Sequence, residues 1–420
     1  MSFLEEYFKK IIVGRHISDL PKSKLPASAA VDNGKYPFIC SSAVIKHTDI
    51  LLQTKPAIVM GTGGIATVNL GKNEFSYSTD TWGFRSNDEE IPTDYLFRKV
   101  QQYLPRIDYA AFEGSGLKHL RKDYVRSLLF EVPKNIKVSN KILEILSIAD
   151  QAIEKTETLI GKLQQIRAGL MYDLFTRGIA DDGQLRTSRE YAPELYKETS
   201  VGWIPKDWKL GGLLDVTDQK RQAILTGPFG ADLSNSDFVE EGVALLRIGN
   251  VQSGYLFLDD LLYVTEKKAK ALQKYKVKTD DLLFARQGAT TGRNCLADST
   301  VNGFLINYHI IRVALDHELC APLFIEAAFN EWAVKSQIER DKGRGTREGI
   351  NTKQLTKLKI PLPSFVEQQE IAKVINKHKT LINVEKNYLD KLLKEKSGLM
   401  DDLLTGKIEV KISDSESIDV

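Results

Sequence analysis

The segment with the most recognisable chemical spacing is Gly61-Thr62-Gly63-Gly64, a glycine-rich turn directly after the apolar stretch Ala57–Met60. Such a turn can hold a phosphate when it opens a helix and carries the right companions. This one lacks the Gly-Lys-Ser/Thr ending of a P-loop and the full G-x-G-x-x-G of a dinucleotide fold. We therefore interpret it as a tight turn that follows a strand.

Motifs for methyl transfer, hydrolysis or metal catalysis are missing from the sequence. A DNA methyltransferase would need an Asp/Asn-Pro-Pro-aromatic motif, and no such tetrapeptide occurs. The carboxylate and lysine set of a metal-dependent nuclease is approached only by Asp260 with Glu266-Lys267-Lys268, which fits the solvated start of a helix better. The six histidines and three cysteines show no ligand spacing. The sequence predicts no catalytic residue, no metal and no cofactor bound by this chain.

Two basic segments that begin with glycines are more informative. One begins at Gly114 and the other at Gly343, and each has few acidic neighbours. Backbone amides and cationic side chains in such loops can hold DNA phosphates without reading bases. Their matched placement predicts DNA contact, which the net charge of +2 would not indicate by itself. The basic candidates are Lys118 and Arg121 in the first segment and Lys342, Arg344 and Arg347 in the second.

An internal repeat supplies the elements that must position these loops. Nine of eighteen positions are identical between 162–179 and 391–408, a shift of 229 residues. Upstream of both segments apolar residues recur in alternating steps of four and three, which is the period of a coiled coil. Arg167 fills one core position of the first series, and Val374, Leu381 and Tyr388 form an adjacent seam that predicts a broader contact stripe for the second series. We expect two long helices that pack together.

The segments in front of the two helices also correspond. Leu128–Pro133 matches Leu358–Pro363, and Ala57–Met60 matches Asp281–Phe284. The predicted fold class is therefore α+β, with two mixed α/β domains separated by two long helices. The expected segments are a first domain over 1–133, a first helix over 134–179, a polar linker over 180–200, a second domain over 201–363, a second helix over 364–408 and a flexible acidic tail over 409–420.

Composition narrows the class of protein. The chain has 420 residues, of which 42% are hydrophobic and 27% charged, as is typical of globular domains. No apolar run approaches the ~18 residues that a membrane-spanning helix needs. Three cysteines are too few and too scattered for a disulfide framework, which favours a reducing compartment. We expect a cytoplasmic protein.

Several motifs of the second half are similar to those of one family. The chain resembles the specificity (S) subunit of type I restriction-modification systems over nearly its whole length. The first half lacks the Ile-Pro-x-x-Trp opening and the Gly-Pro-Phe-Gly motif, so Ala27–Arg85 resembles a different subtype of recognition domain. The motifs that carry the resemblance are Gly202–Trp208, Gly227–Leu233, Leu246–Val251, Ile360–Pro363 and Glu367–Ala372.

The resemblance implies a function in DNA recognition. Two target-recognition domains would each read one half of a bipartite site, and the two helices would pair antiparallel around a pseudo-two-fold axis. Two modification subunits would dock on this scaffold and methylate adenine with S-adenosylmethionine. Restriction subunits would add translocation and cleavage that depend on ATP and Mg²⁺. The chain itself would be a non-catalytic subunit.

The resemblance also directs attention to side chains that can read bases. Arginine can bond bidentately to guanine, glutamine to adenine, and threonine can contact the thymine methyl group. The candidates are Arg286, Gln287, Thr290, Thr291, Arg293, Asn307, Tyr308 and His309 in the second domain, and Thr62, Thr79, Asp80 and Trp82 by position in the first.

Two alternative functions stay open from the residues alone. One is a diverged single-chain DNA methyltransferase or nuclease, and the other is a coiled-coil assembly protein without a role on DNA. Binding of S-adenosylmethionine, metal-dependent nicking or a lack of DNA binding by the complex would separate them from the recognition subunit.

Overall fold

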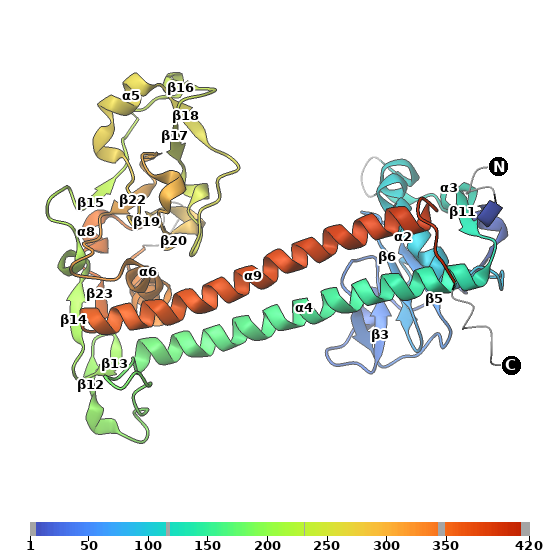
Figure 1. The fold of residues 1–420 in the computed structure, drawn as a ribbon, viewed down its shortest axis with the longest axis horizontal. Coiled ribbons are helices and arrows are strands. Elements are labelled where there is room, and N and C mark those ends of the chain that lie inside the picture. Colours follow the sequence, from blue (N-terminus) through green and yellow to red (C-terminus); the bar gives the residue numbers. More distant parts are fainter. Residues whose placement is uncertain (1–5, 115–117, 231, 343–348, 413–420) are drawn as a thin grey trace. The chain divides into compact units, whose positions relative to one another are not determined.

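The computed structural model describes residues 6–114, 118–230, 232–342 and 349–412, which form two compact units (Figure 1). Unit 1 comprises residues 1–159 and 385–420, and unit 2 comprises residues 160–384. Two long helices contribute to both units: α4 spans Ile136–Thr176 and α9 spans Phe365–Leu404. Each compact unit therefore contains a mixed domain and the adjoining parts of both helices. None of the described helices is long and apolar enough to cross a membrane.

Unit 1 is built on two small sheets. Four strands in the order β2-β8-β5-β6 are all antiparallel, and three strands in the order β4-β3-β7 include a parallel pair, β3 with β7. The central strand β5 is buried along its whole length, as its unbroken apolar sequence predicts. The elements are β1 (Phe8–Ile12), β2 (Ile17–Asp19), β3 (Tyr36–Ile39), β4 (Lys46–Thr48), β5 (Ala57–Gly61), β6 (Val68–Gly71), β7 (Ser76–Tyr77), β8 (Thr81–Ser86), α2 (Thr93–Ala111), β9 (Phe112–Glu113), β10 (His119–Leu120), α3 (Lys122–Ser127) and β11 (Leu129–Pro133).

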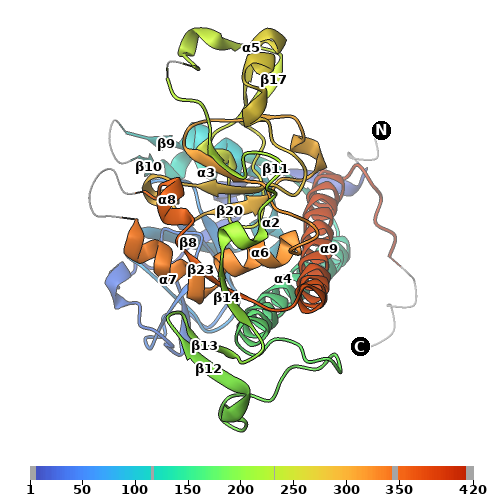
Figure 2. The ribbon, with the colours of Figure 1, turned by 90° about the vertical axis from the view of Figure 1, so that its left-hand side faces the viewer.

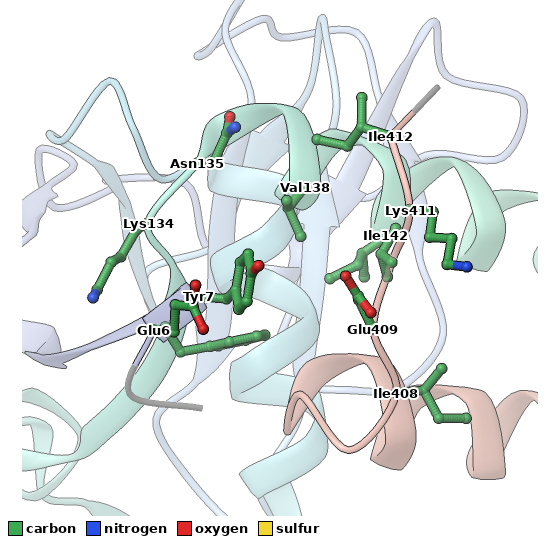
Figure 3. Close-up of a pocket in the computed structure, with 12 residues that line it drawn as sticks. Glu6, Tyr7, Lys134, Asn135, Val138, Ile142, Ile408, Glu409, Lys411 and Ile412 are labelled. Carbon is green, nitrogen blue, oxygen red and sulfur yellow. The ribbon is translucent and has the colours of Figure 1, made fainter. Parts of the chain in front are cut away.

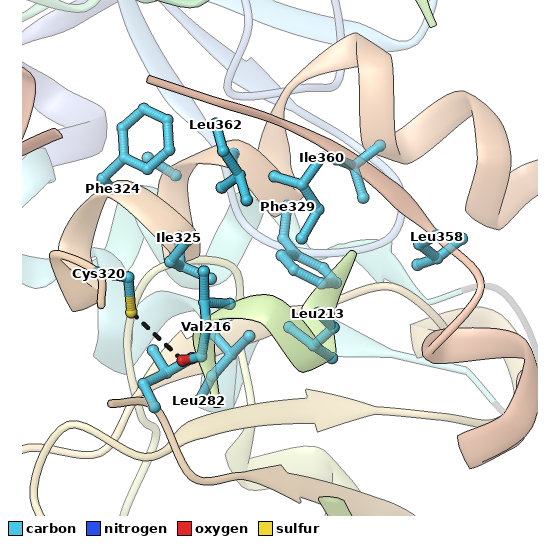
Figure 4. Close-up of a cluster of buried hydrophobic side chains, with 14 of the residues drawn as sticks. Leu213, Val216, Leu282, Cys320, Phe324, Ile325, Phe329, Leu358, Ile360 and Leu362 are labelled. Carbon is cyan, nitrogen blue, oxygen red and sulfur yellow. Dashed lines mark hydrogen bonds between the residues drawn. The ribbon is translucent and has the colours of Figure 1, made fainter. Parts of the chain in front are cut away.

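Unit 2 has two four-stranded sheets, in the orders β15-β22-β19-β20 and β16-β18-β17-β21. A buried apolar cluster joins the first sheet to α6 and to the ribbon β14-β23, and it includes Phe324 and Phe329 of α6 (Figure 4). The elements are β12 (Tyr196–Thr199), β13 (Gly202–Pro205), β14 (Lys209–Gly212), β15 (Ile224–Thr226), β16 (Phe238–Val239), β17 (Val243–Leu246), β18 (Leu262–Val264), α5 (Glu266–Ala271), β19 (Leu282–Ala285), β20 (Asn294–Leu296), β21 (Leu305–Ile306), β22 (Ile310–Val313), α6 (Pro322–Asn330), α7 (Trp332–Asp341), α8 (Thr352–Leu355) and β23 (Lys359–Leu362).

The two units repeat one topology. The order β2-β8-β5-β6 corresponds strand by strand to β15-β22-β19-β20, and β4-β3-β7 corresponds to β18-β17-β21. The parallel pairs also match, since β3 with β7 is equivalent to β17 with β21. Unit 2 adds only β16 to this core among the described strands. The first domain thus has the same fold as the second although it lacks the second domain's sequence motifs.

Within each unit, α4 and α9 lie side by side and run in opposite directions (Figures 1 and 2). In unit 1, Ile142 and Leu146 of α4 share one buried cluster with Leu403 and Leu404 of α9. In unit 2, the other end of α4 shares a cluster with the beginning of α9. Positions early in α4 therefore meet positions late in α9, which confirms the predicted antiparallel pairing.

Three positions of the predicted seam are not in it. Arg167, which we expected to occupy a core position, is exposed, and Leu381 and Tyr388 are 42% and 48% exposed. At another polar position of the seam, Lys396 forms an ion pair with Asp150, with 2.6 Å between Nζ and Oδ1. Val374 of the same adjacent seam is partly buried against the cluster of unit 2, so the contact stripe of α9 is narrower than predicted at Leu381 and Tyr388 but not at Val374.

The contact between the chain that follows one long helix and the first turn of the other long helix differs in the two units. In unit 2, the buried carboxylate of Glu367 accepts two hydrogen bonds from Arg186, at 2.5 and 2.9 Å, and one from Trp208 Nε1 at 3.1 Å. The backbone N–H of Ile179 donates to the same carboxylate at 2.9 Å. This network ties the chain after α4 to the first turn of α9.

In unit 1 the position equivalent to Glu367 is Val138, and a hollow of about 440 Å³ lies beside it (Figure 3). Tyr7, Ile142 and Ile408 also line this hollow. Val410 packs against the buried cluster of unit 1, so residues 409–412, which we expected to belong to a flexible tail, lie against the domain.

Candidate nucleic-acid interface

A glycine turn follows the central strand of each unit. In unit 1, β5 ends at Gly61 and Gly64 has a φ of +83°. In unit 2, β19 ends at Ala285 and Gly288 has a φ of +68°. This backbone conformation is costly for residues with a Cβ and favours glycine. In unit 1 the chain bends at Gly64, but the connection from β5 to β6 spans residues 62–67 and is longer than the tight turn that we predicted. In unit 2 a short 3-10 helix, Gly288–Thr290, follows β19.

Each turn is hydrogen-bonded to the segment that follows a basic glycine loop. In unit 1, Gly64 N–H donates to Lys118 O and Leu120 N–H donates to Thr62 O, both at 3.0 Å. In unit 2, Ile350 N–H donates to Arg286 O at 2.8 Å. The far ends of both basic loops are therefore attached to the glycine turns.

A third loop meets the same turn in each unit. In unit 1, Thr62 donates from its N–H and its Oγ1 to Asp80 O, at 3.0 and 2.9 Å. In unit 2, Arg286 donates from its N–H to His309 O at 3.0 Å and from Nη1 to Tyr308 O at 3.1 Å. Both connections lie directly before the equivalent strands β8 and β22.

Three loops thus converge at one end of the four-stranded sheet in each unit. We call residues 61–64, 78–80 and 118–121 loop face 1, and residues 286–293, 307–309 and 349–350 loop face 2. The convergence rests on backbone hydrogen bonds between segments far apart in the sequence, which makes each face a built surface and not three separate loops.

Loop face 1 gathers most of the candidates in the first domain. Asp80 and Lys118 are exposed, and Thr62 and Thr79 are partly exposed. Arg121 is half-exposed and forms an ion pair with Glu113 at 2.9 Å. These residues place a hydroxyl, a carboxylate and two cations around the glycine turn.

Trp82 is the exception among these candidates. Its side chain is 3% exposed and its ring lies 4.4 Å from the ring of Phe84, centroid to centroid. Lys122 and Arg126 cover the Trp82 ring at 5.8 and 5.3 Å. The ring therefore packs in the domain core and is not presented on loop face 1, because it extends from the inward side of β8.

Loop face 2 brings together the candidates of the second domain, with distinct surroundings for each. The guanidinium of Arg286 donates to two backbone carbonyls, Ile350 O at 3.3 Å and Tyr308 O at 3.1 Å. Gln287 Oε1 lies 2.8 Å from His309 Nδ1. Burial lowers the pKa of His309, and the charge of Arg286 lowers it further. Both effects favour the neutral imidazole.

The remaining candidates of loop face 2 stabilise its shape. Thr290 Oγ1 donates to Gln287 O at 3.0 Å, and Thr291 Oγ1 donates to Gly288 O at 2.8 Å. Their methyl groups remain available for an apolar contact. Arg293 Nη1 donates to Gln252 Oε1 at 2.8 Å, and Asn307 Oδ1 accepts from His309 N–H at 3.1 Å.

The predicted phosphate contacts of the second basic loop are described only at its start. Lys342 forms an ion pair with Glu339 at 2.6 Å on α7. Arg344 and Arg347 lie outside the described residues.

Sequence reasoning missed Phe229, an aromatic residue that packs beside Tyr308 at the edge of loop face 2. Phe229 is 58% exposed, and its ring lies 5.7 Å from that of Tyr308, which is 38% exposed. Gly227 makes this contact possible, because a Cβ at that position would come within 2.3 Å of the backbone of Asn307. The signal was present in the Gly-Pro-Phe-Gly motif, where a large apolar residue follows a turn dipeptide.

The described residues contain no group of histidine, cysteine, aspartate or glutamate side chains that could hold a metal ion. The three cysteines, Cys40, Cys295 and Cys320, are free and buried. What the two loop faces offer is hydrogen-bond donors, acceptors, cations and one aromatic pair, which is the chemistry of recognition.

Two domains of one topology, each with a polar loop face and each joined to the same antiparallel helix pair, define a duplicated recognition protein. Comparison with known proteins assigns the family. Residues 17–165 and 205–394 match the type I restriction modification DNA specificity domain. The chain therefore belongs to the type I restriction-modification specificity family, whose members are the non-catalytic DNA-recognition subunits of these systems.

Individual relatives agree with this assignment. The chain is 26% identical over 413 residues to the type I restriction enzyme MjaVIII specificity subunit of Methanocaldococcus jannaschii. That alignment covers 93% of this chain and 90% of the other protein. It is 20% identical over 282 residues to the EcoBI specificity subunit of Escherichia coli, covering 66% of this chain and 57% of that protein. In fold it is similar to the S subunit from M. genitalium, with a TM-score of 0.63 and 16% identity over 94% of this chain and 96% of that one.

These comparisons favour the recognition subunit over both alternatives. They give no support to a single-chain methyltransferase or nuclease, or to an assembly protein without a role on DNA.

Proposed function

We propose that each loop face contacts one half of a bipartite DNA site. The observation that carries this proposal is the repetition of the same three-loop convergence on the same strand order in both units. A duplicated surface is expected when one chain binds two half-sites that differ in sequence, because the frame is kept and the side chains vary. Thr62 and Asp80 stand in unit 1 where Arg286 and His309 stand in unit 2.

The charge and hydrogen-bonding groups divide into two roles. Lys118, Arg121 and Lys342, with Arg344 and Arg347, hold phosphates and position the chain without reading sequence. Side chains that end in the two loop faces read base edges. These are Thr62, Thr79 and Asp80 in unit 1, and Gln287, Thr290, Thr291, Arg293, Asn307, Tyr308 and His309 in unit 2.

Specificity subunits act on DNA together with other subunits. For this chain we propose two modification subunits, which methylate adenine with S-adenosylmethionine, and restriction subunits that use ATP and Mg²⁺, all in the cytoplasm. The exposed Leu381 and Tyr388 of α9 support such docking, since large apolar side chains on a helix surface are common at protein interfaces.

An exchange of one domain tests the proposal directly. Residues 201–363 are replaced with the equivalent domain of another family member, and the chain is reconstituted with its modification subunits. Sequencing of methylated sites in a random DNA library gives the recognised sequence. We expect one half-site to change while the other half-site is kept. A change in both half-sites would contradict the assignment of one face to each half-site.

The control is a single substitution outside both loop faces. Tyr191→Ala alters an exposed residue of the segment that joins the halves, and both half-sites should be unchanged. The purified chain alone should show no methyl transfer and no cleavage, and methylation by the isolated chain would refute its role as a recognition subunit.

A further inference from the structure

A hydrogen bond between Gln287 and His309 determines which donor and acceptor atoms each side chain can present to DNA. The distance between Gln287 Oε1 and His309 Nδ1 is 2.8 Å. A carboxamide oxygen can only accept, so Nδ1 carries the proton in this bond. In the neutral imidazole the other ring nitrogen, Nε2, is then an acceptor. Gln287 keeps its two N–H donors, and one of the two lone pairs of its oxygen is engaged by His309.

We propose that Gln287 and His309 act as one reading unit of loop face 2, in which Gln287 donates to a base acceptor and His309 Nε2 accepts from a base amino group. The inference rests on the proposed function of loop face 2 as a DNA-contacting surface. It favours a donor contact by Gln287 over bidentate reading of adenine, because bidentate reading also needs the amide oxygen, which already accepts a hydrogen bond from His309. The matching groups in the major groove are guanine O6 or N7, adenine N7 or thymine O4 for Gln287, and adenine N6 or cytosine N4 for His309.

Several contacts hold His309 in the position that this unit needs. Its backbone N–H donates to Asn307 Oδ1 at 3.1 Å, and its ring lies 3.6 Å from the ring of Tyr308. Arg286 helps to hold this arrangement, since two of its five guanidinium N–H groups donate to Tyr308 O and Ile350 O. Arg286 is therefore a positioning residue that joins the His309 loop to the segment after the second basic loop.

The neutral state of the histidine agrees with this assignment. Burial lowers the pKa of His309, and the adjacent guanidinium of Arg286 lowers it further. A protonated imidazole would present a donor at Nε2 and would favour guanine or thymine acceptors instead. The neutral ring gives the acceptor that the reading unit requires.

Two substitutions in the reconstituted methyltransferase complex test the unit. Gln287→Leu removes the donor, and we expect the preference at one base pair of one half-site to fall by roughly fivefold to 140-fold, the range for a specific base contact. His309→Phe keeps a ring against Tyr308 but removes both nitrogens, so the amide oxygen of Gln287 becomes available. At the base pair that depends on Gln287, the preferred base should then change to adenine. The readout is sequencing of methylated sites in a random library.

A chemical test addresses the histidine separately. A base analogue that lacks the exocyclic amino group, purine in place of adenine or pyrimidinone in place of cytosine, is placed at the base pair that responds to His309→Phe. Wild type should bind the analogue more weakly than the natural base by a factor in the same range, and His309→Phe should bind both equally. His317→Phe is the matched control, because it makes the same change at an exposed histidine beyond the far end of β22.

The outcomes separate this inference from the proposed function. If wild type selects adenine at the base pair that Gln287→Leu disturbs, and His309→Phe leaves that choice unchanged, the reading unit is wrong while loop face 2 still contacts DNA. If neither substitution changes the recognised sequence at full methylation activity, loop face 2 is not the DNA-reading surface, and the proposed function fails with it.

Discussion

A buried lysine under the end of α9 makes a testable contribution to the stability of unit 1. Lys99 is 2% exposed, and its Nζ donates to Leu404 O, the last residue of α9, at 2.9 Å. The ammonium also lies 5.7 Å from the ring centroids of Tyr103 and Phe130. The carbonyls of the last helical turn have no partner within the helix. Lys99 therefore caps α9 from a neighbouring helix.

Burial of the charged Lys99 side chain lowers the free energy of unfolding, and the size of this penalty depends on pH. Burial lowers the pKa of Lys99 from 10.5 to about 8. Between pH 8 and pH 10.5 the unfolded state binds more protons than the folded state, so stability rises with pH in this window. At 1.36 kcal/mol for each pH unit, the full penalty below pH 8 is about 3.4 kcal/mol, and about 2.5 kcal/mol of it is relieved between pH 7 and pH 10.

The substitution Lys99→Met keeps the length of the side chain and removes its charge. At pH 7 it relieves the burial penalty but leaves Leu404 O without this donor, which costs about 1–3 kcal/mol, so the two effects largely cancel. At pH 10 most of the burial penalty is relieved, so the lost hydrogen bond dominates. We expect the variant to lose about 2.5 kcal/mol relative to wild type as the pH rises from 7 to 10.

Urea unfolding at several pH values measures this difference. Cys40 is the only cysteine of unit 1 and is buried, so its alkylation reports the unfolding of that unit. Groups that titrate equally in both proteins cancel in the comparison. Parallel stability curves for wild type and Lys99→Met across this range would refute the argument that Lys99 is deprotonated in the folded protein.

Three further predictions concern the network at α9, the basic loop and the helix pair. Glu367→Gln should lower the free energy of unfolding of unit 2 by about 1–3 kcal/mol, because Arg186 loses its buried carboxylate partner and keeps only the more exposed Asp207. Glu370→Gln, in an exposed pair, should change it by less than about 1 kcal/mol in the same urea titration. Arg344→Ala with Arg347→Ala should weaken binding to all DNA sequences alike and reduce the slope of log affinity against log salt by about 1 for each residue, whereas lost discrimination at one base pair would mark them as base readers. One heptad inserted at equivalent points of α4 and α9 lengthens each helix by about 10 Å, so a selection over randomised spacers should favour sites about three base pairs longer; an unchanged spacer at full affinity would contradict a role of the helices in setting that distance.

The helix pair was accessible to sequence reasoning because its period reflects burial. Ile142, Leu146 and Ile371 are fully buried, and all three lie in the predicted series. The series failed at Arg167, which reaches out of the seam and lowers the pKa that burial raises for Glu326 and Glu331. A long cationic side chain can extend away from an apolar seam so that its charged end lies near carboxylates outside the seam. Heptad spacing does not show where those carboxylates are.

The loop faces were predicted in parts but not as surfaces. The glycine turn, the basic loops and the segment before β22 were each identified from local residue types. Their convergence depends on hydrogen bonds such as Thr62 to Asp80 and Arg286 to Tyr308, which join positions that no local pattern connects. Trp82 was selected by its place in the chain, but the alternation of β8 directs its ring inward. Phe229 was overlooked because its Gly-Pro-Phe-Gly motif was used only as a sign of the family and of a turn, and its side chain was not considered as part of the site.

The way in which each loop face is held together bears on how recognition can change. Many of the hydrogen bonds that join its loops end on backbone atoms: Thr62 and Arg286 both reach the carbonyls of the loop before the next strand, and Gly64 and Ile350 tie the basic loops through their N–H groups. Backbone partners are the same for every residue type. A threonine in unit 1 and an arginine in unit 2 therefore support one frame, although their side chains differ in size and charge. Residues that end on the faces can consequently be substituted without altering strand order, which is how one topology can serve two different half-sites within a single chain.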